Sequence, residues 1–226
     1  MTIQRRRKIV KRQRSSVGLA LVAAISFLAG MTDAIGLLAL GDFVSFMSGN
    51  TTRASVAIAD GDFVRAALLM GGLVAFILGN AAGVIVALKA RLQAVLLCVT
   101  VILALAALVP HLHSARFLLL IFAMGNVNAA VEQIEGLPIG LTYVTGALSR
   151  FGRGLGRWII GVRNTQWIIQ IVPWSGMLVG AIAGSVLQRH AAPLALWAPF
   201  CVSAILTAAA VMIPRRWSRR LVQAHR

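Results

Sequence analysis

Long apolar stretches recur along this chain of 226 residues and constrain its fold more than any other feature. An α-helix rises about 1.5 Å per residue, so roughly 20 apolar residues cross the hydrocarbon core of a bilayer. Hydropathy predicts spans at Val17–Leu40, Phe63–Leu88, Ala94–Val109, Phe117–Val131, Ile168–Leu187 and Pro193–Ile213. With 59% hydrophobic and 12% charged residues, the chain lies outside the ordinary soluble classes. We therefore expect an all-α integral membrane protein with about six transmembrane helices.

The positive charges gather at the two ends of the chain. Of 22 Lys and Arg residues, seven lie in a basic arm, residues 1–16, and five in a basic tail, residues 215–226. With the N-terminus in the cytoplasm, the inner segments carry 18 of them and the outer segments carry four. Cytoplasmic segments of membrane proteins are enriched in Lys and Arg. Both termini are therefore predicted to be cytoplasmic, where the basic ends would contact anionic lipids.

A net charge of +16 also raises nucleic acid as a partner. The sequence has no zinc-finger spacing, no RNP-type aromatic strand and no basic helix within a soluble domain, so we expect no nucleic-acid partner. It also lacks the G-x-S-x-G, H-E-x-x-H, Cys-x-x-Cys and P-loop motifs. His111, His113 and His190 have no acidic or thiol ligand beside them. We expect no enzymatic activity, no cofactor and no metal site.

Four sequence blocks occur in the same order in both halves of the chain, which indicates an internal duplication. The offset between the copies drifts only from 95 to 104 residues. The aligned blocks are 27–34 with 122–129, 45–53 with 142–150, 79–83 with 180–184, and 98–103 with 201–206. Asp33 stands opposite Asn128 in the first block. We expect two three-helix repeats, residues 17–110 and 111–214, the second inserted upside down about a pseudo-two-fold axis in the membrane plane.

A polar motif interrupts the apolar pattern after the first span of each half. It reads hydroxyl, aromatic, apolar, hydroxyl, Gly, two variable residues, hydroxyl and Arg, over residues 45–53 and 142–150. Polar backbone at membrane depth is tolerated only inside protein or along a water-filled cavity, so each motif predicts a broken or re-entrant helix. The expected caps are Ser48 or Asn50 in the first half and Thr145 or Ser149 in the second. The expected stops are residues 60–62 and residues 152–154.

An alternative topology makes residues 43–59 and 137–153 full spans, which gives eight helices and parallel repeats. That arrangement would leave Lys89 and Arg91 outside and would put Arg53 in the middle of a helix. The six-span arrangement is therefore favoured.

Asp33 lies deep in the first predicted span, where an ionisable residue is costly and usually faces a partner or a cavity. It is either functional or a structural carboxylate bonded to a neighbouring helix or to Arg53. The other acids, Asp42, Asp60, Asp62, Glu132 and Glu135, fall at span ends and turns and are expected to be solvated.

A helix N-terminus inside the bilayer offers free N–H groups to an anion or a substrate oxygen. The candidate substrate-binding residues are therefore the polar groups of the first spans and of the two motifs. They are Asp33, Ser48, Asn50, Thr51, Arg53, Asn126, Asn128, Tyr143, Thr145 and Arg150. Glycines at four-residue spacing, in 79–83 and 176–184, are expected to let helices of the two halves approach closely.

The runs 33–36, 38–41, 43–53 and 142–146 resemble the YoaK-type bacterial inner-membrane proteins, over roughly residues 18–213. The resemblance implies a multi-pass protein of the bacterial inner membrane, in a family described as having no known function. The chain departs from the family pattern at Val127, where Gln is usual, and at Ala147, where a hydroxyl residue is common.

Three functions fit these observations. The first is a transporter or exporter of a small polar solute that works by alternating access between the two halves. The second is a small channel lined by the same residues. The third is a non-transporting membrane protein that acts through its helix-packing partners, with a homo-oligomer as one form.

Overall fold

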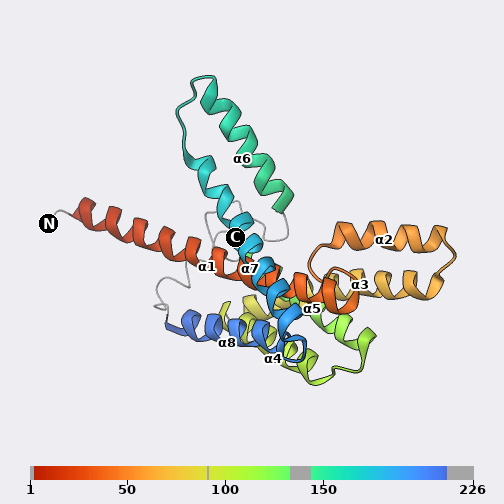
Figure 1. The fold of residues 1–226 in the computed structure, drawn as a ribbon. Coiled ribbons are helices and arrows are strands. Elements are labelled where there is room, and N and C mark those ends of the chain that lie inside the picture. The colour runs from red at the N-terminus through yellow and green to blue at the C-terminus, as the bar shows by residue number, and fades with distance from the viewer. Residues whose placement is uncertain (1–2, 91, 133–143, 213–226) are drawn as a thin grey trace.

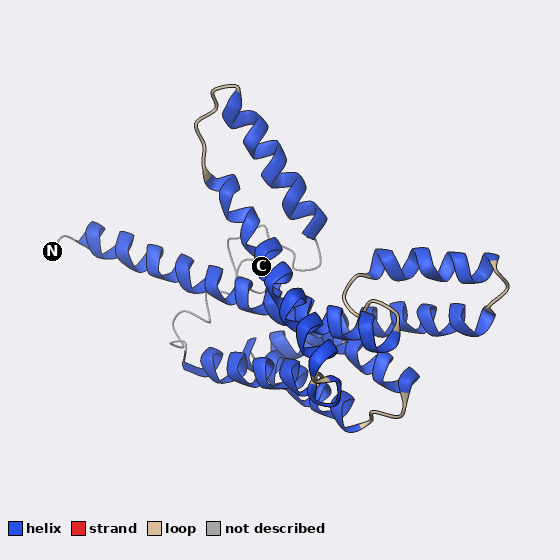
Figure 2. Cartoon of the chain, in the orientation of Figure 1, coloured by secondary structure: helices blue, strands red, loops and turns tan. Residues whose placement is uncertain are grey.

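The computed structural model describes residues 3–90, 92–132 and 144–212, and this part of the chain is entirely helical (Figures 1 and 2). The α-helices are α1 (Ile3–Leu40), α2 (Met47–Ala59), α3 (Phe63–Lys89), α4 (Leu92–Leu108), α5 (His113–Glu132), α6 (Val144–Ile159), α7 (Ile171–His190) and α8 (Trp197–Met212). Two short 3₁₀ segments, η1 (Gln166–Gln170) and η2 (Ala192–Leu194), precede α7 and α8. The expected all-α class is confirmed.

Four helical segments are long and apolar enough to cross a membrane, namely Ser16–Leu40, Phe63–Lys89, Trp167–His190 and Ala192–Met212. They coincide with four of the predicted spans. Helices α4 and α5 cover the remaining two, α4 as an apolar helix of 17 residues. The short helices α2 and α6 have 13 and 16 residues.

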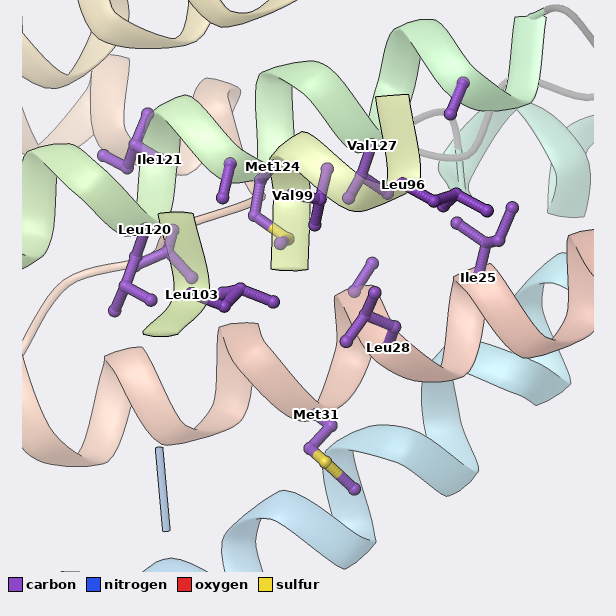
Figure 3. Packing of buried hydrophobic residues seen from close by; sticks show 14 of the residues in the cluster. Ile25, Leu28, Met31, Leu96, Val99, Leu103, Leu120, Ile121, Met124 and Val127 are labelled. Carbon is purple, nitrogen blue, oxygen red and sulfur yellow. The ribbon is translucent and has the colours of Figure 1, made fainter. Parts of the chain in front are cut away.

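Helices α1 and α5 form the centre of the bundle. Protein covers 67% of the apolar window of α1, against 22% for the segments of α3 and α7. Nearly all of α5 from Arg116 to Ala130 is buried or half-buried. Figure 3 shows Ile25 and Leu28 of α1 facing side chains of α4 and α5. Because lipid is as apolar as these side chains, close packing rather than the hydrophobic effect holds the helices together.

Glycines bring α1 against α7 and α3 against α5. A Cβ on Gly180 would lie 2.0 Å from the carbonyl oxygen of Phe27, and one on Gly79 would lie 2.3 Å from that of Phe122. These are the same contact made twice, because Phe27 aligns with Phe122 and Gly79 with Gly180. The prediction that these glycines allow close helix approach is confirmed, and each close pair joins one half of the chain to the other.

Helices α4 and α8 run antiparallel and meet through a buried hydroxyl pair. The Oγ1 atom of Thr100 lies 2.8 Å from Oγ of Ser203 and 3.1 Å from Oγ1 of Thr207. Towards the start of α4, Gln93 Nε2 donates to the carbonyl oxygen of Ala210, near the end of α8, at 2.9 Å. Thr100 and Ser203 are aligned in the sequence blocks 98–103 and 201–206, so aligned residues contact each other directly.

The first polar motif forms a separate short helix, as expected, but its cap differs from the prediction. Helix α2 begins after Phe46 with no hydrogen bond from a side chain of its own N-cap, so capping by Ser48 or Asn50 is wrong. The predicted stop at residues 60–62 is confirmed: Gly61 has φ +76°, and the Asp62 side chain caps α3 by accepting from the Arg65 amide.

The predicted stop of the second motif at residues 152–154 is wrong. Helix α6 continues to Ile159, and the turn follows at Gly161, whose φ is +99°. Helical glycines cost about 1 kcal/mol each, but Gly154 lies directly against the Trp167 side chain, which a larger residue could not do. Thr145 and Ser149 lie inside α6 rather than before it, so neither is its N-cap. The segment that leads into α6 is outside the described residues.

Candidate functional site

The break between α1 and α2, residues 41–46, is organised by the carboxylate of Asp33. Its Oδ1 atom accepts the backbone amides of Val44 at 2.8 Å and Ser45 at 2.7 Å. Asp33 is itself buried, about two turns before α1 ends. It therefore holds the backbone of the break just before the N-cap residue of α2, Phe46.

This arrangement gives Asp33 a structural partner, the backbone of the break. Amides at membrane depth must have a partner, and Asp33 supplies it for the break. The protein's own carboxylate thus binds the chain immediately before the N-terminus of α2. Of the two structural partners considered for Asp33, Arg53 is not the one, because Arg53 pairs with Asp42.

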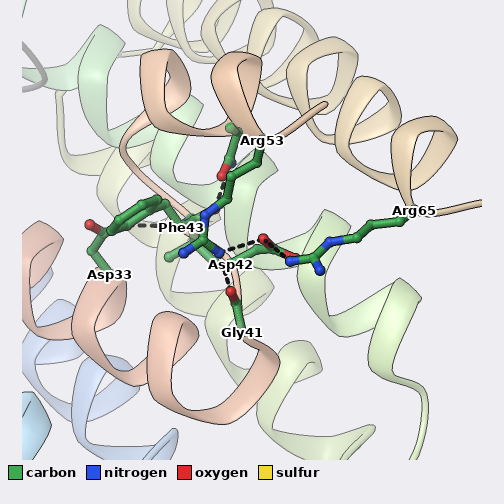
Figure 4. Close-up of polar contacts among 8 residues, drawn as sticks. Asp33, Gly41, Asp42, Phe43, Arg53 and Arg65 are labelled. Atoms are coloured by element: carbon green, nitrogen blue, oxygen red, sulfur yellow. Dashed lines mark hydrogen bonds and ion pairs between the residues drawn. The ribbon is translucent and has the colours of Figure 1, made fainter. Parts of the chain in front are cut away.

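A second cluster gathers around Asp42, where two arginines converge (Figure 4). Asp42 Oδ1 lies 2.6 Å from Nη1 of Arg53 and 3.2 Å from Nη2 of Arg65. Arg53 also donates to the carbonyl oxygen of Gly41, and its guanidinium lies 4.9 Å from the centre of the Phe43 ring. The expectation that Asp42 is solvated is wrong, because the break folds it back beneath α2 and the start of α3.

The other candidates on α2 divide between the two sides of the helix. Asn50 is fully buried; its Nδ2 donates to the carbonyl oxygen of Phe43 at 2.6 Å, and its Oδ1 has no partner among the described residues. Ser48 and Thr51 are exposed, and the Thr51 hydroxyl bonds back to the carbonyl oxygen of Met47. Asp33, Asn50 and Arg53 therefore converge on the break, whereas Ser48 and Thr51 face away from it.

The candidates of the second half form separate pairs. Asn128 Nδ2 donates to Oδ1 of Asn80 on α3 at 2.9 Å. Arg150 Nε donates to Oε1 of the buried Gln170 at 2.8 Å. Asn126 bonds within its own helix, to the carbonyl oxygen of Phe122. Thr145 is exposed on α6, and Tyr143 lies outside the described residues.

The sequence does not predict three of the polar residues that take part in these contacts, namely Arg65, Asn80 and Gln170. Asn80 lies inside the glycine block 79–83, whose pattern predicts only a packing surface. Arg65 and Gln170 fall at the start of predicted spans, where a polar residue ordinarily faces water. Nothing in their local pattern indicates a buried partner.

A helical bundle of apolar spans, with buried polar groups bonded at a helix break, defines the chain as an integral membrane protein. Residues 21–209 match the family described as "Protein of unknown function (DUF1275)", and the chain belongs to that family. This confirms the family resemblance that the motif residues carry.

A curated relative is similar along nearly its whole length. The protein named "UPF0700 transmembrane protein RA0705", from Rhizobium meliloti (strain 1021), is 70% identical over 223 residues, covering 99% of both chains. Its name supports a membrane protein and assigns it no activity. No solved structure matches the chain.

Proposed function

We propose that this protein is a secondary transporter of a small polar solute, in which two inverted repeats rock against each other around α1 and α5. The observation that carries the proposal is that helices of one half pack closely on helices of the other half. The first span of each half packs on the second span of the other, α1 on α7 and α5 on α3, through equivalent glycine contacts. Inverted repeats with discontinuous helices near the midplane are a common transporter plan.

The direction of α4 and α8 supports inversion over parallel repeats. A two-fold axis in the membrane plane reverses the direction of each equivalent helix, and an axis along the membrane normal does not. Helices α4 and α8 are equivalent, run antiparallel, and meet at the equivalent residues Thr100 and Ser203. Helix α2, with 13 residues, is too short to cross a bilayer, which supports a six-span arrangement. The distribution of Lys and Arg supports placing both termini of this arrangement on the cytoplasmic side of the bacterial inner membrane.

The break provides a chemical basis for transport. Asp33 is a buried carboxylate held by backbone amides, and its twin in the second half is the neutral Asn128. A proton on Asp33, or a solute oxygen that competes for the Val44 and Ser45 amides, weakens the hold of Asp33 on the start of α2. The break then opens on one side only, because the second half has no ionisable group at this position.

The test is reconstitution of the purified chain into liposomes with a panel of small polar solutes, with and without an imposed pH gradient. We expect saturable flux that responds to the gradient in the wild type and is lost in Asp33→Asn. Asp60→Asn, a change of the same chemistry at an exposed turn, is the matched control and should transport normally.

Flux that rises linearly with solute concentration would indicate a channel instead. An absence of flux across the whole panel, with correctly folded protein in the vesicles, would remove the transporter proposal and leave a protein that acts through its partners.

A further inference from the structure

Helix α6 is amphipathic in a way that its counterpart α2 is not. At 100° per residue, its apolar side chains Leu148, Phe151, Leu155 and Ile159 fall on one side. Ser149, Arg150, Arg153 and Arg157 fall on the opposite side. After Arg53, which aligns with Arg150, α2 carries no further basic residue. The two added arginines, Arg153 and Arg157, are exposed.

Protein covers little of this helix. Ala147 is the only buried residue of the helix. Helix α6 contacts η1 through Arg150, which bonds to Gln170, and through Phe151 and Gly154, which both lie against Trp167. Figure 1 shows α6 and the start of α7 extending away from the rest of the bundle. The apolar residues Leu148 and Leu155 are left exposed beside the arginine side.

The turn after α6 is an apolar tip. Ile159 is 69% exposed, Ile160 79% and Val162 51%, and Arg163 stacks on the Trp158 ring at 4.9 Å. The equivalent turn after α2 is Asp60-Gly61-Asp62, which is acidic and exposed. The two repeats therefore present opposite chemistry at corresponding turns.

We propose that α6 and its tip, residues 144–163, form an anchor that inserts into an anionic lipid surface. Basic amphipathic helices with a Trp near the boundary bind in the plane of such a surface, apolar side inward. The adjoining candidate span begins at Trp167, so the tip lies within a few residues of the membrane boundary. No Asp or Glu follows Glu135 in the sequence, so neither α6 nor any later segment carries an acidic residue that competes for the arginines.

A spin label at Ile160→Cys, in a Cys98→Ala/Cys201→Ala background of the full chain, reports the depth of the tip. The chain is reconstituted in vesicles of phosphatidylcholine alone or mixed with phosphatidylglycerol, and collisions with oxygen and with a water-soluble nickel chelate are compared. We expect the label to lie deeper in the anionic vesicles. R153Q/R157Q should shift the ratio of inserted to free tip roughly fivefold per arginine towards water.

Two controls isolate the anchor from the rest of the chain. R189Q removes an exposed arginine at the other end of α7 and should leave the depth unchanged. A label at Asp60→Cys, on the acidic turn, should meet the nickel chelate in both lipids. The proposal is overturned if the label at position 160 stays in water in anionic vesicles, or if R153Q/R157Q shifts it no more than R189Q. It is also overturned if the label is shielded from both reagents, which would show that protein covers the tip.

Discussion

At the scale of single residues, the carboxylate of Asp33 holds the break between α1 and α2 in place. Asp33 accepts hydrogen bonds from the amides of Val44 and Ser45, and neither amide can turn to water inside a membrane. The corresponding Asn128 carries an amide that donates to Asn80. The two halves therefore use different chemistry at one position, an acceptor in the first and a donor in the second.

Removing this acceptor should be costly. Asp33→Ala leaves buried amides unpaired and should lower the free energy of unfolding by about 3 kcal/mol. Asp33→Asn keeps one acceptor oxygen and should cost roughly half as much. The measurement is thermal or denaturant unfolding of the purified protein in detergent, followed by circular dichroism.

Asp60→Ala provides the baseline for this series, because Asp60 is an exposed carboxylate at the end of α2. It should unfold with the wild type, to within about 0.5 kcal/mol. An Asp33→Ala protein as stable as Asp60→Ala would show that the break is held by something other than this carboxylate.

The sequence points to Asp33 because an acid deep in an apolar span stands out from its surroundings. It does not point to Asp42, which lies just past Gly41 at the end of the same span and there looks like an ordinary solvated turn residue. Its burial depends on the fold-back of the break, which brings Arg53 and Arg65 together from two helices. A pattern read along one segment does not contain that convergence.

At the scale of elements, α1 and α7, and likewise α3 and α5, approach so closely at glycines that their backbones are in contact. Gly180→Ala puts a Cβ against the carbonyl oxygen of Phe27 and should force α1 and α7 apart, costing about 2 kcal/mol. Gly79→Ala should do the same to α3 and α5 through Phe122. The unfolding free energy of each variant is the measurement.

Gly71→Ala, on the same helix as Gly79, is the matched control. Its nearest neighbour atom, on Leu118, would be 3.7 Å from the new Cβ, an ordinary contact. Alanine favours helix over glycine by up to about 1 kcal/mol, so this variant should be neutral or slightly stabilised. Equal losses in Gly71→Ala and Gly79→Ala would contradict close backbone packing as the cause.

The hydroxyl pair between α4 and α8 should be energetically coupled. A double-mutant cycle with Thr100→Val and Ser203→Ala should give an interaction energy of about 0.6 kcal/mol, the typical value for hydrogen bonds between transmembrane helices. Thr207→Ala paired with Ser203→Ala tests whether Thr207 takes over the bond. A coupling of zero in both cycles would mean that the hydroxyls meet without a bond between them.

Element boundaries were predictable where the chain itself carries the signal. Asp60-Gly61-Asp62 ends one helix and caps the next, and both events follow from local chemistry. Glycines 152 and 154 carry a similar local signal, yet α6 runs through them. Gly154 lies against the Trp167 side chain, where a larger residue would clash. Such tertiary packing outweighs the weak local tendency of glycine to end a helix.

At the scale of the whole molecule, the repeated blocks of sequence contain more of the architecture than the hydropathy does. Hydropathy ranks helices by how well they would face lipid, so it marks α3 and α7 at the periphery as clearly as the central α1. Helix α5 is surrounded by protein and can carry Asn126 and Asn128, which weakens its apolar signal. The matched glycine blocks, by contrast, coincide with the surfaces on which the two halves meet.

The orientation of the second half is the property on which the transport proposal depends, and the two turns after α2 and α6 can report it. Single cysteines at Asp60 and Thr165, both exposed, are introduced into a Cys98→Ala/Cys201→Ala background. A membrane-impermeant maleimide is then applied to intact cells and to inverted vesicles. With inverted repeats, Asp60→Cys should react only from outside and Thr165→Cys only from the cytoplasmic side.

Parallel repeats make the opposite prediction, because α2 and α6 would then cross the bilayer in the same direction. Both cysteines would react from one compartment, and the antiparallel meeting of α4 and α8 through Thr100 and Ser203 would have no symmetry to explain it. The assay needs no substrate and no flux, so it separates the architecture from the activity. If the two turns lie on opposite sides of the membrane and the protein transports nothing, the inverted-repeat architecture holds and only the transport function is wrong.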